Sequence, residues 1–166
     1  MTEFWHDAGC KFHPVSAPDY LPVEQLRQLQ LHRLRAVVRR AFENVALFRE
    51  RMDGLGMTPD DVRDLSDTAK LPFTVKTDLR DTYPFGLFAS PMNEVVRLHA
   101  SSGTTGKPIV VAYTQEDLRV WASVMVRSFA ACGLDRGDII QNAYGYGLFT
   151  GGLGAHYGAE RLGAVV

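Results

Sequence analysis

The sequence predicts an α/β fold that has α+β character toward its N-terminus. A helical pattern comes first, over residues 22–51. Two β-rich segments follow, joined by a loop of glycine, serine, threonine and lysine. From Ile139 onward a strand pattern, a helix pattern and a second strand pattern alternate, which is typical of an α/β unit.

The composition is that of a globular protein with its own core. The chain has 166 residues, 46% hydrophobic and 22% charged, which suffices for one domain. A net charge of -1 argues against nucleic-acid binding, which needs a basic face. The sequence predicts no membrane span and no signal peptide. Two cysteines make no disulfide framework, which favours the cytoplasm.

The N-terminal 21 residues predict irregular structure because prolines recur in them. The spacing of His6, Asp7, Cys10 and His13 is local, and no second ligand pair follows in the usual zinc pattern. A loosely ordered tail is therefore favoured over a metal site.

A long amphipathic helix is expected from Pro22, a residue suited to a first helical turn, to about Arg51. Whether this helix runs on or kinks near Asn44 is left open by the pattern. Five arginines on the opposite side predict a solvated face. The apolar face recurs at three- and four-residue steps and consists of Leu26, Leu29, Leu34, Val37, Val38, Ala41, Phe42 and Val45.

Two short helices are expected next. Thr58 is predicted to cap a short helix through Asp64, and Thr77 to cap residues 78–81. Lys76 beside the second start is favoured as a surface lysine rather than a ligand contact.

A third helix is expected between Thr114 as its cap and Gly133 just past its end. Cys132 is predicted to be a small buried hydrophobe. The expected buried stripe consists of Leu118, Trp121, Ala122, Met125, Phe129 and Cys132.

The loop between the two predicted strands, 95–100 and 109–113, is the main candidate site. It brings together four hydroxyl side chains, two glycines and a lysine. Glycines permit close backbone approach, successive N–H groups form an anion nest, and the hydroxyls and the lysine add donors. Pro108 stands where a Walker A loop needs a hydroxyl. The residues alone leave two readings open, a phosphate cradle and an ordinary Gly/Ser/Thr hairpin loop.

A second candidate lies between Tyr144 and Gly154, which hold five glycines and three aromatic residues. Helical spacing from Leu148 through Leu162 places glycines at and inside a helix start, where they cost stability. This cost indicates that a larger side chain does not fit, because of tight packing or because of a ligand.

The loop sequence from Ser101 to Pro108, SSGTTGKP, resembles the phosphate loop of the adenylate-forming superfamily. The stretches 142–158 and 76–86 resemble the phenylacetate–CoA ligase family. This resemblance covers the chain from about Leu26 to Val166, and that family is well over twice as long as this chain.

The resemblance implies the architecture of an incomplete adenylate-forming enzyme. Residues 1–90 would be an N-terminal helical and irregular segment that packs on the core. Residues 91–166 would be the start of the AMP-binding α/β domain, with the phosphate loop. The second half of that domain and the C-terminal domain would be missing, so we expect an N-terminal part or a truncated gene model, inactive alone.

The resemblance also implies the chemistry. The whole enzyme would adenylate phenylacetate with ATP and Mg²⁺ and transfer the acyl group to CoA. Tyr144, Phe149 and Gly151 would line the aryl pocket, with no catalytic residue and no metal ligand assignable. The ATP phosphates would be held by Ser101, Ser102, Gly103, Thr104, Thr105, Gly106 and Lys107.

Two alternatives remain open at this stage. The acid could be another aryl acid such as a benzoate, or the chain could be a truncated, non-catalytic phosphate- or nucleotide-binding module. The expected partners are the aryl carboxylate, ATP and CoA, without nucleic acid or membrane, and with a possible homodimer when the protein is full length. His156 is expected to be structural rather than catalytic.

Overall fold

The structure is a computed structural model that describes residues 13–101, 108–147 and 150–166. Its contacts form two compact units, residues 22–115 and a second unit that joins the N-terminal segment up to Leu21 to Glu116–Val166. Each unit has its own set of internal contacts. The predicted functional division into residues 1–90 and 91–166 stays a prediction.

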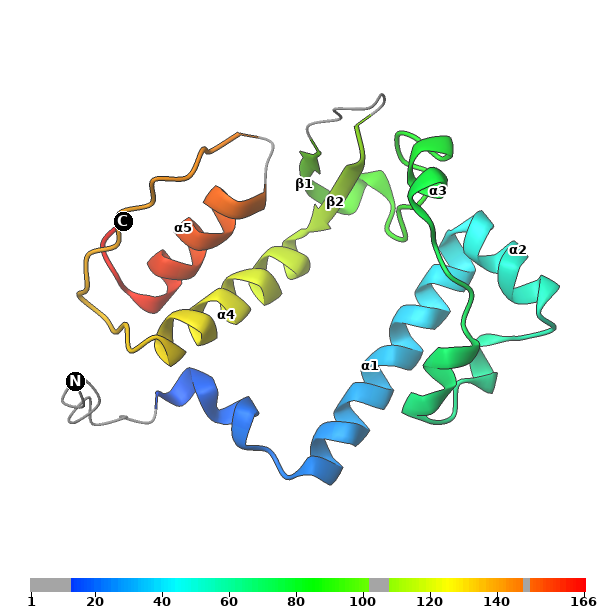
Figure 1. Ribbon diagram of the computed structural model, residues 1–166, viewed down its shortest axis with the longest axis horizontal. Coiled ribbons are helices and arrows are strands. Elements are labelled where there is room, and N and C mark those ends of the chain that lie inside the picture. The colour runs from blue at the N-terminus through cyan, green and yellow to red at the C-terminus, as the bar shows by residue number, and fades with distance from the viewer. Residues whose placement is uncertain (1–12, 102–107, 148–149) are drawn as a thin grey trace, which may run out of the picture. The chain divides into compact units, whose positions relative to one another are not determined.

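The described residues are rich in helix and contain one two-stranded sheet, which fits an incomplete α/β fold (Figure 1). The α-helices are α1 (Val23–Asn44), α2 (Ala46–Gly54), α3 (Lys76–Asp81), α4 (Gln115–Ala131) and α5 (Thr150–Leu162). The 3₁₀ helices are Pro14–Tyr20, Pro59–Asp61, Leu65–Lys70 and Met92–Glu94. The strands are β1 (Val95–Ala100) and β2 (Val110–Thr114). No helix within the described ranges is long and apolar enough to cross a membrane.

The predicted long helix is two helices. The backbone of Val45 is extended, with φ -113° and ψ 104°, so α1 ends at Asn44 and α2 begins at Ala46. The guanidinium of Arg49 donates to the carbonyl oxygens of Phe42 and Glu43, which the end of α1 leaves without helical partners. The kink that the sequence left open is therefore a full break.

The core of the 22–115 unit lies where α1 and α2 meet the segment after them. Val38, Met52 and Val62 are buried there, and five half-buried apolar side chains pack against them, Leu34, Phe42, Phe48, Met57 and Leu71. Arg35 on α1 donates to the carbonyl oxygens of Val62 and Arg63. Arg35 belongs to the face that was predicted to be solvated, and it also holds the segment at Val62 and Arg63 against α1.

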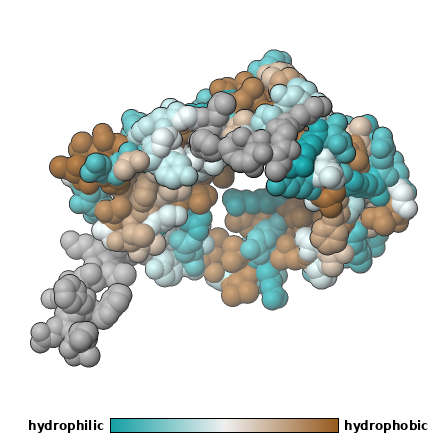
Figure 2. All heavy atoms as spheres, turned by 45° about the horizontal axis from the view of Figure 1, so that its top comes forward, coloured by the Kyte–Doolittle hydropathy of each residue, from teal (hydrophilic) through white to brown (hydrophobic). Residues whose placement is uncertain are grey.

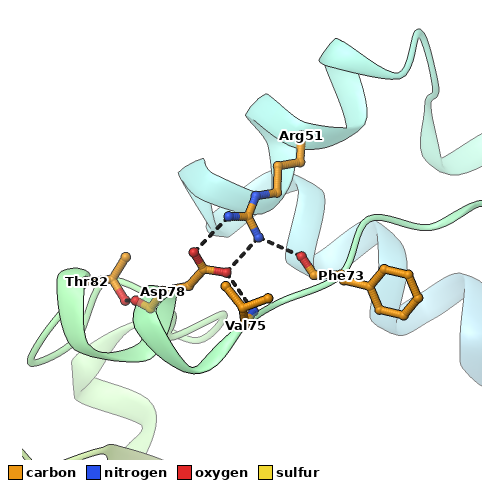
Figure 3. Close-up of polar contacts among 5 residues, drawn as sticks. All are labelled: Arg51, Phe73, Val75, Asp78 and Thr82. Atoms are coloured by element: carbon orange, nitrogen blue, oxygen red, sulfur yellow. Dashed lines mark hydrogen bonds and ion pairs between the residues drawn. The ribbon is translucent and has the colours of Figure 1, made fainter.

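An ion pair joins α2 to the start of α3 (Figure 3). The two terminal nitrogens of Arg51 donate to the two carboxylate oxygens of Asp78 at 2.7 and 2.8 Å, and Arg51 also donates to the carbonyl of Phe73. Asp78 accepts the N–H of Val75 at 2.8 Å. The prediction of Thr77 as the cap was wrong. The helix begins two residues earlier, at Lys76, because Asp78 reaches back to the backbone of Val75.

Replacing Asp78 with asparagine is expected to lower the thermal midpoint of the protein by several degrees. The change removes the charge that faces Arg51 and leaves that guanidinium, two-thirds shielded, without its counter-ion. Asp81→Asn, on the exposed side of the same short helix, is the matched control and should leave the midpoint unchanged. Equal midpoints for the two variants in a thermal melt would contradict this role of Asp78.

Asp67 is a second buried carboxylate in this unit. It accepts a hydrogen bond from the Lys70 ammonium at 2.7 Å and from the N–H groups of Asp64 and Arg63 at 2.8 Å. Lys70 first, and then these two N–H groups, lower the pKa of Asp67 from 3.8 to about 2.

The lowered pKa of Asp67 predicts a loss of stability in acid. A folded-state pKa below the unfolded value means that the contribution is fully present above pH 3.8 and is lost as the pH falls toward about 2. Asp67→Asn should therefore flatten the fall in unfolding free energy across this window. Parallel acid-unfolding curves for the wild type and the variant would contradict it.

The second unit is built on α4 and α5, which lie side by side (Figure 1). A Cβ atom at Gly154 would lie 2.5 Å from the Trp121 ring, and one at Gly158 would lie 2.3 Å from Met125 Cβ. The missing side chains thus let the two helices approach closely, which identifies tight packing as the reason for these two glycines. Arg127 on α4 also pairs with Asp19 of the 3₁₀ helix Pro14–Tyr20, a segment predicted to be irregular.

Two details of α4 differ from the prediction. Cys132 is exposed, because α4 ends at Ala131 and the chain turns through Gly133 at φ 85°. The prediction of a buried Cys132 was therefore wrong. Val126, which the predicted stripe left out, is the most deeply buried side chain of α4 at 2% exposure.

The predicted strands at Ile139–Asn142 and at the C-terminus reduce to a single parallel bridge between Ile139 and Val165. Ile139 is 82% exposed and Val165 58% exposed, so neither residue of this bridge is buried. Hydrophobic surface lies among hydrophilic surface on the face shown in Figure 2. The small cores thus cover only part of the chain's apolar side chains.

Candidate functional site

The predicted phosphate loop connects β1 to β2, which pair as an antiparallel hairpin. The strands pair from Val95↔Thr114 to Ala100↔Val110, with an irregularity near the open end. His99 is buried at 2% exposure and its ring packs edge-on against Tyr113, with centroids 5.2 Å apart. The hairpin therefore has a fixed base on which the loop is carried.

Ser101 closes this base. Its N–H donates to the carbonyl of Ile109 at 2.9 Å, and its Oγ accepts the N–H of Ile109 at 2.9 Å. Ser101 is exposed, and its hydroxyl hydrogen is not used in either bond, so it can still donate to an anion. Ser102, Gly103, Thr104, Thr105, Gly106 and Lys107 lie outside the described residues.

Tyr144 and Gly151, the predicted pocket residues, are in contact. A Cβ atom at Gly151 would lie 3.0 Å from Cε1 of Tyr144, so the ring lies against the first turn of α5. Tyr144 is 62% exposed and presents a flat, accessible aromatic surface. Phe149 lies outside the described residues. Ser101 belongs to the 22–115 unit and Tyr144 to the other, so the geometry of each is a property of its own unit.

Asn142 is a residue of this region that the sequence reasoning missed. Its amide nitrogen donates to the carbonyl of Gly152 at 2.8 Å and to the hydroxyl oxygen of Tyr146 at 3.0 Å. Its amide oxygen accepts the N–H of Tyr144 at 3.3 Å. One signal was present in the sequence, since Asn142 is a polar residue at the end of a strand pattern, just before the glycine-rich segment.

His156 continues these contacts from the middle of α5. Its Nδ1 lies 3.1 Å from the Tyr146 hydroxyl, and its Nε2 lies 3.3 Å from a Glu160 carboxylate oxygen. The expectation that His156 is structural stays a prediction.

The lowered carboxylate pKa values of the described residues have structural causes. The Lys70 ammonium first lowers the pKa of Asp67, and the Arg51 guanidinium first lowers that of Asp78, with backbone N–H groups second in both. For Asp61 and Asp64 the backbone N–H groups of Thr58 and Ser66 come first in lowering the pKa. No group of three or more His, Cys, Asp or Glu that could hold a metal lies within the described ranges. We therefore assign no metal ligand.

Two pockets in the 22–115 unit lie away from the hairpin. One, of about 460 Å³, lies between α1 and the segment 64–66 and has a mixed polar lining that includes Arg27 and Asp64. The other, of about 190 Å³, is mainly apolar and includes Phe48 and Leu87. Neither includes a predicted site residue.

Comparison with curated proteins gives closely similar sequences. The phenylacetate-coenzyme A ligase of Pseudomonas putida is 61% identical over 144 residues, which are 87% of this chain and 33% of that protein. The chain is homologous to the phenylacetate-coenzyme A ligases. Those of Aromatoleum evansii and Escherichia coli (strain K12) are 56% and 59% identical over 92% and 87% of the chain. The chain thus spans about a third of the length of these ligases, and no family model matches it.

Solved structures of a CoA ligase have the same fold as this chain. A 2-hydroxyisobutyryl-CoA ligase in complex with 2-HIB-AMP and CoA matches with a TM-score of 0.79 and 32% identity, over 87% of this chain and 31% of that one. Another crystal structure of that ligase, in the postadenylation state, matches with a TM-score of 0.80 and 26% identity, over 95% of this chain and 35% of that one. These matches confirm the predicted resemblance to adenylate-forming CoA ligases in sequence and fold.

Proposed function

We propose that the protein to which this chain belongs is an AMP-forming ligase that joins phenylacetate to CoA. The observation that carries the proposal is the 56–61% identity to three phenylacetate-coenzyme A ligases over 87–92% of the chain. The shared fold with a CoA ligase that holds an acyl-adenylate and CoA supports the same chemistry.

The proposed reaction has two steps. A carboxylate oxygen of the acid attacks the α-phosphorus of ATP, the bond to the β-phosphate breaks, and pyrophosphate leaves. The sulfur of CoA, as thiolate, then attacks the carbonyl carbon of the acyl-adenylate, and AMP leaves with the electrons of the acyl–oxygen bond. Both steps develop negative charge on a phosphate leaving group, so donors placed around phosphate oxygens accelerate them.

The loop from Ser101 to Lys107 is the proposed holder of the β- and γ-phosphates. The closed hairpin base, Ser101 against Ile109, supports this because a fixed base lets a donor-rich loop bind an anion without reordering its strands. The loop supplies hydrogen-bond donors and a cation, and neither a nucleophile nor a general base.

The aryl ring is proposed to bind against Tyr144, with Gly151 leaving space beside it and Phe149 as a further wall. The Tyr144 ring is accessible and lies against the first turn of α5, which supports this proposal. Apolar rings bind between aromatic walls and small residues.

Mg²⁺, cytoplasmic location and a homodimer of the full-length protein complete the proposal. Mg²⁺ would offset the negative charge of the ATP phosphates. No residue of this chain is assigned as its ligand. The expected reducing compartment follows from the cysteine usage.

The test is thioester formation by the full-length gene product with ATP, Mg²⁺, CoA and a panel of acids. We expect turnover with phenylacetate, weaker turnover with benzoate, and little with 2-hydroxyisobutyrate, the acid of the structural neighbour. Equal or better turnover with either other acid would contradict phenylacetate as the substrate. Pyrophosphate release with no acid at all would contradict the ligase reading.

A further inference from the structure

The segment from Asn142 to Gly147 has no regular secondary structure, yet it carries Tyr144. Its position therefore depends on side-chain contacts. Asn142 uses both amide hydrogens and its amide oxygen, toward the Gly152 carbonyl, the Tyr146 hydroxyl and the Tyr144 N–H. One side chain thus joins this segment to the first turn of α5 and to the backbone of the residue that carries the ring.

The contacts beyond Asn142 have a definite direction when His156 is neutral. Because the Tyr146 oxygen accepts from Asn142, its own hydrogen is available for Nδ1 of His156 at 3.1 Å. Nδ1 is then the acceptor, and Nε2 carries the ring hydrogen toward Glu160 at 3.3 Å. Each donor in this chain of contacts meets an acceptor.

Packing restrains the same groups. The rings of Tyr146 and His156 meet edge-on, with centroids 5.5 Å apart and planes at 82°, and Tyr157 contacts the His156 ring in the same manner. A Cβ atom at Gly152 would lie 2.5 Å from the Gly145 carbonyl oxygen, so α5 and the segment are also in close backbone contact. Movement of the Tyr146 hydroxyl would disturb both helix and segment.

We propose that Asn142, Tyr146 and His156, ending at Glu160, are positioning residues that fix the segment bearing Tyr144 for binding of the acid. This inference rests on the proposed function. These residues act through Tyr144 and not on the reacting atoms. Their loss should weaken binding of the acid and leave binding of ATP unchanged.

The test uses the full-length enzyme with phenylacetate varied at saturating ATP and CoA, and then with ATP varied. Tyr146→Phe removes one hydroxyl and keeps the ring, so the KM for phenylacetate should rise about fivefold, the effect of one hydrogen bond, with the KM for ATP and the thermal midpoint unchanged. His156→Ala should raise the same KM to a similar degree.

The double variant Tyr146→Phe with His156→Ala should have a KM for phenylacetate no higher than that of the poorer single variant, because both changes break one chain of contacts. Tyr157→Phe, which keeps the other ring against His156, is the comparison variant, and its KM for phenylacetate should rise less than that of Tyr146→Phe.

The outcomes separate this inference from the proposed function. A wild type inactive with every aryl acid would overturn the proposed function, and the inference with it. An active wild type whose Tyr146→Phe variant keeps its KM for phenylacetate would overturn the inference alone. So would an equal rise in both KM values, or additive effects in the double variant.

Discussion

Replacing Gly158 with leucine is expected to destabilise the α4–α5 pair by about 3 kcal/mol or more. The new Cβ would lie 2.3 Å from Met125 Cβ and 3.2 Å from the Phe129 ring. Gly158 is buried in the middle of α5, so the side chain has no route to solvent without moving one helix. The readout is urea unfolding followed by tryptophan fluorescence, since Trp121 lies in the same contact.

Gly54→Leu is the control for that prediction. Gly54 is the last residue of α2, and a Cβ atom there would meet no atom within 4 Å beyond its chain neighbours and the backbone of its own helix. The control should be neutral or slightly stabilising, because most residues favour a helix more than glycine does. If Gly158→Leu unfolds at the same urea concentration as Gly54→Leu, close helix contact is not what requires glycine at position 158.

Converting Thr104 and Thr105 together to valine is expected to lower kcat/KM for phenylacetate-dependent pyrophosphate release by about 100-fold. Valine keeps the size and branching of threonine and removes the hydroxyl donors proposed to bind the phosphates. The assay uses the full-length enzyme with ATP and Mg²⁺.

Thr74→Val, which changes an exposed threonine outside the loop, should leave that rate unchanged. Wild-type kcat/KM in the double loop variant would show that the loop hydroxyls do not assist the reaction, and would favour the ordinary hairpin loop that the residues alone left open.

Local patterns predicted the elements whose causes are local. Apolar periodicity indicated α1, and β-rich runs indicated the hairpin that carries the loop. The glycines of α5 indicated either tight packing or a ligand, and at Gly154 and Gly158 the structure shows tight packing. The break at Val45 was left open, because it depends on Arg49 reaching the end of α1 and on the backbone of a single residue.

The errors arose where distant groups or the exact end of an element decide the structure. The start of α3 depends on Asp78, which is held by Arg51 from another helix. Exposure of Cys132 depends on where α4 ends, a boundary that periodicity defines poorly. The role of Asn142 was missed because its partners, Gly152 and Tyr146, have no pattern that links them in the sequence. The phosphate loop could be predicted as a candidate because its donors are consecutive.

The most direct test of the proposed ligase is acid-dependent exchange of labelled pyrophosphate into ATP, measured on the full-length protein with Mg²⁺ and without CoA. Exchange requires a reversible acyl-adenylate step and needs no thiol. We expect exchange with phenylacetate and none without an acid. Thioester formation without any phenylacetate-dependent exchange, or no exchange with any aryl acid, would contradict an adenylate-forming ligase.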